Sequence, residues 1–254
     1  MRQLKITLLA LAVSACATRP VPQNSLSAPP AAPATEELVV TETLHGVEIS
    51  DPYRRLEDQD SSATRHWIAR QNAYTDAVLD PRPEAALFSP RLTALMNTDK
   101  IGTPKYHNGR YFFVHRGIGE DLYSIYLRNG AHGKDELLVD PAPMSADHTT
   151  SVGIYDVSAD AKVLAYSVRK GGADEIEVHF LDPETRQEIG APLGIARYYG
   201  VSITDDRQLY FTRATPAGPR IYRRALAGGD ETEVFRAGYG REKTLLAWVS
   251  EHVP

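Results

Sequence analysis

The sequence lacks the residue patterns that would carry catalysis or cofactor binding. Serine hydrolases of the α/β type hold their nucleophile in a G-x-S-x-G turn, because small flanking residues permit the strained strand-to-helix backbone. No such string occurs among the 254 residues, and the nearest segment, 200–203 (GVSI), lacks the second glycine. The H-E-x-x-H zinc motif is absent, and the glycines at 117–119 and 130–134 have the wrong spacing for nucleotide loops. We therefore expect no catalytic, cofactor-binding or metal-binding residues in this chain.

The only cysteine, Cys16, stands where a covalent modification is expected. Arg2 and Lys5 precede an uncharged, mostly apolar run, residues 6–15 (ITLLALAVSA), which is too short to span a bilayer but suits a signal-peptide core. The run ends in V-S-A-C, which resembles the bacterial lipobox, whose cysteine receives the lipid. Residues 1–16 are therefore predicted to be a lipoprotein signal peptide that leaves the protein anchored at the outer membrane or periplasmic face of the envelope. The alternative is an ordinary secretory signal that contains a cysteine.

Composition narrows the class of partner. The chain is 42% hydrophobic and 24% charged, which is typical of a globular protein. Its formal net charge of −5 provides no basic surface for nucleic acid. One cysteine excludes an internal disulfide, and thirteen tyrosines against three methionines favour β-structure.

The N-terminal third is predicted to be helical after a Pro- and Ala-rich tether at residues 17–35. Within the helical segment, residues 36–104, residues 36–49 read as one or two extended pieces. Asp60 or Ser61 can cap a helix that runs to about Leu79, where Asp80-Pro81 stops it. A second helix is expected after Ser89, with Pro90 in its first turn and Leu92, Leu95 and Met96 on its apolar side.

From about residue 105 the hydrophobic period changes from 3.6 to 2, which predicts strands. The expected strands are 111–115, 122–128, 136–139, 163–168, 176–181, 209–213, 220–225 and 231–235. Residues 160–167 (DAKVLAYS) match residues 205–212 (DDRQLYFT) at an offset of 45, and residues 108–113 (NGRYFF) form a looser third copy. Repeats of this length built from short strands predict β-propeller blades, with an antiparallel sandwich as the alternative. The fold class is therefore mainly β, with an incomplete propeller of about three blades over residues 105–254.

One segment near the N-terminus carries a specific motif. Residues 44–72 read LHGVEISDPYRRLEDQDSSATRHWIARQN. This segment resembles the start of prolyl oligopeptidases and their oligopeptidase B relatives, where H-G, a short gap and D-P-Y-R-W-L-E-D precede a helix that ends near Q-N. The matching residues are His45, Gly46, Asp51, Pro52, Tyr53, Arg54, Leu56, Glu57, Asp58, Trp67, Gln71 and Asn72. Arg55 departs from the pattern, which usually has tryptophan there.

The resemblance implies a particular architecture and activity. In that family the N-terminal segment packs against an α/β-hydrolase domain with a Ser–Asp–His triad, and a seven-bladed propeller restricts access to short, often proline-containing peptides. This sequence has no pattern for the hydrolase domain. The hypotheses are a truncated peptidase that is inactive alone, a split enzyme whose hydrolase half is encoded separately, and a lipid-anchored envelope module that binds peptides or proteins.

Overall fold

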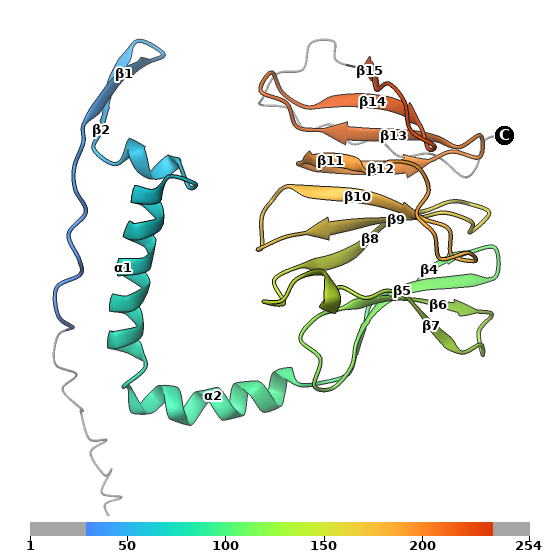
Figure 1. The fold of residues 1–254 in the computed structure, drawn as a ribbon, viewed down its shortest axis with the longest axis horizontal. Coiled ribbons are helices and arrows are strands. Elements are labelled where there is room, and N and C mark those ends of the chain that lie inside the picture. The colour runs from blue at the N-terminus through green and yellow to red at the C-terminus, as the bar shows by residue number, and fades with distance from the viewer. Residues whose placement is uncertain (1–28, 236–254) are drawn as a thin grey trace, which may run out of the picture. The chain divides into compact units, whose positions relative to one another are not determined.

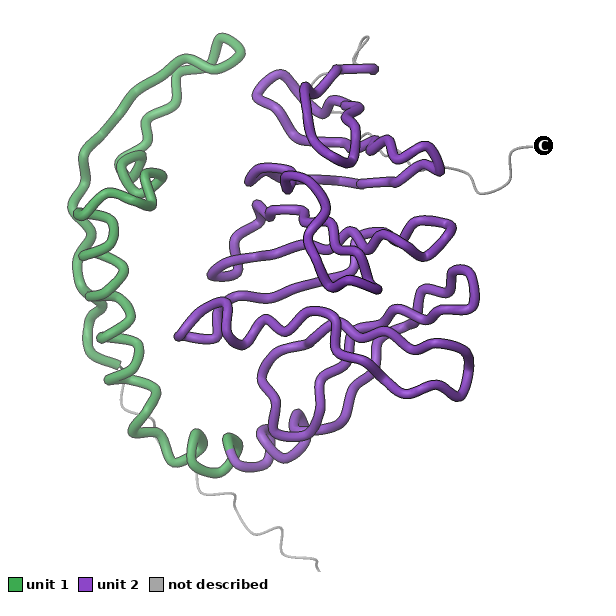
Figure 2. The backbone as a smooth tube through the Cα atoms, turned by 45° about the vertical axis from the view of Figure 1, so that its right-hand side comes forward, with its two compact units in different colours: residues 1–89 green, residues 90–254 purple. Residues whose placement is uncertain are grey.

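The computed structural model describes residues 29–235, so Cys16 and the predicted signal peptide lie outside the described residues. The chain divides into two compact units, residues 1–89 and 90–254 (Figure 2).

The first unit contains a hairpin, a short 3-10 helix and a long helix. Its elements are β1 (Val40–Leu44), β2 (Val47–Asp51), η1 (Arg54–Glu57) and α1 (Ser62–Leu79). The two extended pieces expected at 36–49 are confirmed as the β1–β2 hairpin. Of the two candidate caps for α1, Ser61 is the one used, because its Oγ accepts from Thr64 N at 3.2 Å. The helix ends at Leu79, as the Asp80-Pro81 sequence predicts.

Helix α2 (Pro83–Met96) begins earlier than expected. Pro83 occupies its first position, where a missing N–H costs nothing, so Pro90 falls inside the helix and not in its first turn. Pro90 has no N–H to donate, which leaves the carbonyl of Ala86 without its helical partner. The predicted apolar side is exposed: Leu92, Leu95 and Met96 are 57%, 54% and 56% accessible.

The second unit contains three antiparallel sheets stacked side by side (Figure 1). We call them blades 1 to 3, in chain order. Blade 1 contains β3 (Lys100–Ile101), β4 (Lys105–His107), β5 (Arg110–Arg116), β6 (Ser124–Asn129) and β7 (Asp135–Val139), and η2 (Ala142–Met144) follows it. Blade 2 contains β8 (Ser151–Val157), β9 (Leu164–Arg169), β10 (Ile176–Leu181) and β11 (Leu193–Ala196). Blade 3 contains β12 (Tyr198–Ile203), β13 (Gln208–Arg213), β14 (Arg220–Ala225) and β15 (Thr232–Phe235).

Blades 2 and 3 are simple meanders, and in blade 1 both β3 and β4 pair with β5; this series of small sheets confirms the propeller prediction over the sandwich. Blade 2 has the order β8-β9-β10-β11 and blade 3 the order β12-β13-β14-β15. The chain therefore passes from the outer strand of blade 2, β11, to the inner strand of blade 3, β12. All eight predicted strands are present, with ends within two residues of those expected. The sequence missed β3, β4, β11 and the inner strands β8 and β12.

Two apolar clusters hold the blades together. Between blades 1 and 2 lie Phe112, Ile125 and Leu164, each with 0% of its surface accessible. Between blades 2 and 3 lie Phe180 and Phe211, also at 0%. Because alternate side chains of a strand point to opposite faces, the middle blade contributes one face to each cluster. Each blade interface is therefore a small core in its own right.

Candidate functional site

The first motif residues form a hairpin turn. His45 and Gly46 have φ values of 52° and 81°, and Leu44 pairs with Val47 across them. A two-residue turn with both φ values positive matches the twist of the flanking strands and favours glycine. His45 and Gly46 therefore serve the backbone and supply no reactive group.

The D-P-Y-R part of the motif ties this hairpin to the 3-10 helix. The Asp51 carboxylate accepts from Arg54 Nε at 3.0 Å and from Tyr53 N at 2.8 Å. These bonds hold the pKa of Asp51 below its usual value, and the bond from Arg54 has the largest effect. Arg54 also pairs with Glu42 on β1, and the Tyr53 hydroxyl donates to Glu37 at 3.1 Å. The motif thus fixes how the chain leaves β2.

The motif residues of α1 bind the segment before the hairpin. Trp67 Nε1 donates to Thr35 Oγ1 at 2.8 Å, and Gln71 Nε2 donates to the carbonyl of Pro33 at 3.0 Å. One turn further, the Tyr74 hydroxyl donates to the carbonyl of Pro30 at 2.5 Å. Proline keeps its carbonyl acceptor although it lacks an N–H, so a Pro-rich segment can dock in this way. Residues 30–35 therefore lie extended along α1.

The remaining motif residues sit around these contacts. Leu56 and Glu57 belong to η1, Asp58 follows it, Pro52 precedes Tyr53, and Asn72 is exposed on α1. Leu56 N donates to the Tyr53 carbonyl at 2.9 Å, and Asp58 Oδ1 accepts from Asp60 N at 3.3 Å. The motif brings together a structural network and not a set of convergent nucleophile, base and acid groups.

In the second unit, the inner strands of successive blades are joined by hydrogen bonds. Lys105 Nζ donates to the carbonyl of Tyr155 on β8 at 2.8 Å, and the Tyr155 hydroxyl donates to the carbonyl of Tyr198 on β12 at 2.9 Å. Asp156 Oδ2 accepts from Ile203 N at 3.1 Å. Burial raises the pKa of Asp156 despite this bond. Sequence reasoning missed this row because β8 and β12 were not predicted.

The repeated turn forms a second set of contacts between blades. Ala161 and Arg207 both have positive φ, 57° and 62°, and occupy the same position in their turns. They are 46 residues apart, one more than the 45 residues that separate the matching strands. Arg207 donates to Asp160 Oδ2 at 2.5 Å, which joins blade 3 to blade 2. Arg110 of blade 1 donates to the Ala161 carbonyl at 3.2 Å. The polar residues of the repeat therefore connect neighbouring blades.

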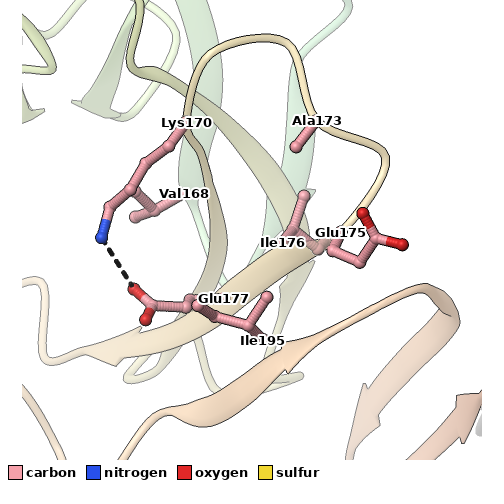
Figure 3. Close-up of a pocket in the computed structure, with 7 residues that line it drawn as sticks. All are labelled: Val168, Lys170, Ala173, Glu175, Ile176, Glu177 and Ile195. Carbon is pink, nitrogen blue, oxygen red and sulfur yellow. Dashed lines mark ion pairs between the residues drawn. The ribbon is translucent and has the colours of Figure 1, made fainter. Parts of the chain in front are cut away.

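Two hollows lie at equivalent places on blades 1 and 2. The blade 1 hollow, about 270 Å³, is formed by the β5–β6 hairpin and the loop after β7 and contains Glu120, Asp121 and Asp140. The blade 2 hollow, about 210 Å³, lies at the β9–β10 hairpin. Its walls are mostly apolar, and Lys170 and Glu177 approach one another at its edge, 3.9 Å apart (Figure 3).

A histidine cluster on blade 2 is the nearest approach to a catalytic arrangement. His179 lies between Glu177, at 3.4 Å, and Glu188, at 3.8 Å, and Tyr166 donates to Glu188 at 2.5 Å. The bond to Glu188 raises the pKa of His179 above its usual value, although burial opposes this. No serine or cysteine bonds to this histidine within residues 29–235, so the cluster forms no nucleophile–base pair.

Other chemistry finds no support in the described part of the chain. Between residues 29 and 235, every paired strand is antiparallel, and no group of three or more His, Cys, Asp or Glu side chains is placed to hold a metal ion. Over the same residues, no helix is long and apolar enough to cross a membrane.

The comparison with known proteins decides the family. Residues 32–236 match the family model described as prolyl oligopeptidase, N-terminal beta-propeller domain. The chain belongs to the prolyl oligopeptidase family. The match spans the docked segment, the motif and all three blades, so the resemblance seen at residues 44–72 extends over most of the chain.

Individual relatives in the prolyl oligopeptidase family agree. A prolyl endopeptidase of Elizabethkingia miricola is 30% identical over 180 residues, which cover 71% of this chain and 25% of that enzyme. A dipeptidyl aminopeptidase BI of Pseudoxanthomonas mexicana is 25% identical over 273 residues, covering 94% of this chain and 38% of its own. The chain thus spans between a quarter and two fifths of the length of these relatives.

Solved structures give the same fold. A structure from a mechanistic study of two prolyl endopeptidases superposes with a TM-score of 0.71 at 29% identity, over 84% of this chain and 33% of that one. Prolyl oligopeptidase B from Galerina marginata superposes with a TM-score of 0.63 at 16% identity, which shows the shared fold alone.

Proposed function

We propose that this chain is the access-restricting propeller region of a serine peptidase that hydrolyses short, often proline-containing peptides. The observation that carries the proposal is the match of residues 32–236 to the propeller domain of the prolyl oligopeptidase family. In this proposal the Ser–Asp–His triad belongs to an α/β-hydrolase domain that the 254 residues do not supply, either in a longer product or as a separate chain.

The contacts between blades fit such a role. A filter must keep its inner strands at a fixed spacing, and here the side chains of Lys105, Tyr155 and Asp156 each bond directly to the backbone of the next blade. Two of these donors or acceptors join β8 to β12, and the third joins β4 to β8. Hydrogen bonds that cross a blade interface resist sliding of one blade past another, because sliding would leave partly buried polar groups unpaired.

The first test is the chain on its own. Purified without residues 1–16, it should leave a chromogenic proline-containing dipeptide intact. The reason is that no G-x-S-x-G string is present to hold a nucleophile. Turnover that persists through purification and is blocked by a fluorophosphonate would show a serine nucleophile in this chain and contradict the proposal.

The second test asks for the catalytic half. The reading frame downstream of this gene should encode further blades and a G-x-S-x-G segment, and co-expression should give a stable complex that cleaves the same dipeptide. The matched control replaces the serine of that segment with alanine, which should keep the complex and remove activity. Unrelated downstream genes, together with a monomeric chain that binds peptides, would favour the envelope binding module instead.

We also propose that the protein is exported and anchored through a lipid on Cys16. The apolar run that ends in V-S-A-C supports this proposal. Expression in bacteria fed labelled palmitate should label the protein, and Cys16→Ala should abolish the label. A protein that carries no label, or one whose label survives Cys16→Ala, would rule out lipidation at this residue.

A further inference from the structure

The hollow on blade 1 has an uncompensated negative charge. Glu120 Oε2 accepts only from Gly117 N, at 2.7 Å, and Asp140 Oδ1 accepts only from Ala142 N, at 2.9 Å. Asp121 makes no hydrogen bond or ion pair with any residue that the structure describes. No lysine or arginine lines this hollow, and His148 is the one basic side chain in its lining. Three carboxylates therefore share about 270 Å³ with backbone amides as their only donors.

In the equivalent hollow on blade 2, a lysine balances the charge of a carboxylate. There the Glu177 carboxylate of β10 faces the Lys170 ammonium across 3.9 Å, and Lys170 directly follows β9 (Figure 3). Glu175, on the same hairpin, points away from this pair (Figure 3). The blade 1 hollow has the acidic groups without a lysine or arginine beside them, so a cation from elsewhere would complete it.

A second feature of the blade 1 hollow points to a ligand. Ser124 lines it and is only 9% accessible, yet its hydroxyl makes no hydrogen bond with any residue between 29 and 235. Ser124 lies on the same face of β6 as Tyr126, since Ile125 and Leu127 point into the core between blades 1 and 2. The Ser124 hydroxyl has a free acceptor position, so a donor group of a ligand that enters the hollow would pair with it.

An aromatic ring completes the wall. Tyr126 lines the hollow, and its ring stacks on Phe113 with 16° between the planes. Burial raises the pKa of Tyr126, and the charges of Glu120 and Asp140 raise it further, so the field of these carboxylates reaches the phenol. An aromatic face beside carboxylates attracts a planar cation, which can stack on the ring while it donates to the acids.

We propose that the blade 1 hollow binds the guanidinium group of an arginine side chain presented by a peptide. The planar fork of arginine carries five donors, enough for Glu120, Asp121 and the Ser124 hydroxyl at once. A lysine ammonium is a more compact and more strongly hydrated charge that cannot stack in the same way. The site needs no catalytic domain, so it stands or fails independently of the peptidase proposal.

The binding test uses the full 254-residue chain and isothermal titration calorimetry. Nα-acetyl-L-arginine amide should bind with a dissociation constant on the order of 1 mM at low salt. Affinity should fall several-fold when sodium chloride rises from about 20 to about 200 mM, because the ions screen exposed charges. Nα-acetyl-L-citrulline amide, which has the same shape without the charge, should not bind. Equal binding of the citrulline compound, or of the lysine analogue, would overturn the proposal.

Variants locate the site. Glu120→Gln with Asp121→Asn should weaken the arginine compound tenfold or more, since both changes keep the size of the side chain and remove its charge. Ser124→Ala should weaken binding a few-fold without lowering the melting temperature, because the hydroxyl has no partner in the described chain. Glu175→Gln is the matched control: it removes one charge from the equivalent hairpin of blade 2 and should leave binding unchanged. Equal losses in the control and the double variant would refute the site.

Discussion

Ser158 lies at the centre of the blade 2 turn, and its removal should destabilise the second unit. Ser158 is 2% accessible. Its Oγ donates to Asp160 Oδ1 at 2.7 Å and accepts from Val163 N at 2.9 Å and Lys162 N at 3.2 Å. In Ser158→Ala the amide of Val163, itself buried, loses this acceptor.

The size of the effect follows from burial. A buried donor left without a partner costs about 1–3 kcal/mol, and the lost bond to Asp160 adds about 1 kcal/mol. The expected loss is thus about 2–4 kcal/mol, which lowers the melting temperature of a unit of this size by about 4–16 °C. The repeat supplies a matched control, because Thr204 accepts from Gln208 N at 2.9 Å in blade 3 with both residues partly exposed. Thr204→Ala should cost under about 1 kcal/mol, since water can replace the hydroxyl.

Thermal unfolding followed by circular dichroism measures both variants, and urea titration checks that the slope of the unfolding free energy is unchanged. Ser158→Thr should restore most of the stability, because blade 3 already uses threonine at this position. The reasoning fails if Ser158→Ala and Thr204→Ala lower the melting temperature equally, or if Ser158→Thr is as unstable as the alanine variant.

Four further predictions concern pH, docking and association. Burial acts to raise the pKa of Asp160, but hydrogen bonds, that of Ser158 first, hold it at about 2, so its contribution is present above about pH 4 and disappears as the pH falls towards 2. Because the carboxylate is 41% exposed, Asp160→Asn should cost at most about 1 kcal/mol at pH 6 and nothing near pH 2 in unfolding experiments. The raised pKa of His179, due first to Glu188, has the opposite sign: its contribution is present below about pH 6.5 and disappears as the pH rises through the folded value, so His179→Gln should lower the melting temperature at about pH 5.5 and leave it unchanged at about pH 9. Trp67→Phe removes the donor to Thr35 and should speed proteolytic cleavage within residues 30–35 several-fold, as Thr35→Val should. Light scattering should show that the chain without residues 1–16 associates, because α2 exposes large apolar side chains, whereas a monodisperse monomer with one sharp melting transition would contradict this.

The outer parts of each blade could be predicted from sequence, and the inner strands could not. Strand β10 has the predicted ends because residues 176–180 (IEVHF) alternate regularly and Asp182-Pro183 follow the strand. Strands β8 and β12 carry Gly153 and Gly200, which sit opposite Ser167 and Thr212 at the same register position. Glycine weakens the strand pattern, and at Gly153 a Cβ would lie 3.2 Å from Ser167 Oγ. The glycine that allows the two strands to pack closely therefore also removes the side chain by which the strand could have been recognised in the sequence.

The motif could be recognised from sequence, but its contacts could not. Trp67 and Gln71 stood out by their spacing. The acceptor for Gln71 is the backbone carbonyl of Pro33, and because every residue has a backbone carbonyl, the sequence does not mark this one as the partner. The pair of Asp160 and Arg207 is similar: both lie in the repeat, but only the folded blades show that they meet. In the blade 1 hollow, Glu120 and Asp140 are twenty residues apart, and no local pattern links them.

If Cys16 carries a lipid as proposed, the docking of residues 30–35 on α1 limits how far the fold can stand from the membrane. Pro30, the first residue held by α1, follows Cys16 by fourteen positions. A chain of that length reaches at most about 50 Å when fully extended. With a lipid on Cys16, helix α1 would thus be held within about 50 Å of the bilayer surface, where the headgroup region itself occupies several ångströms.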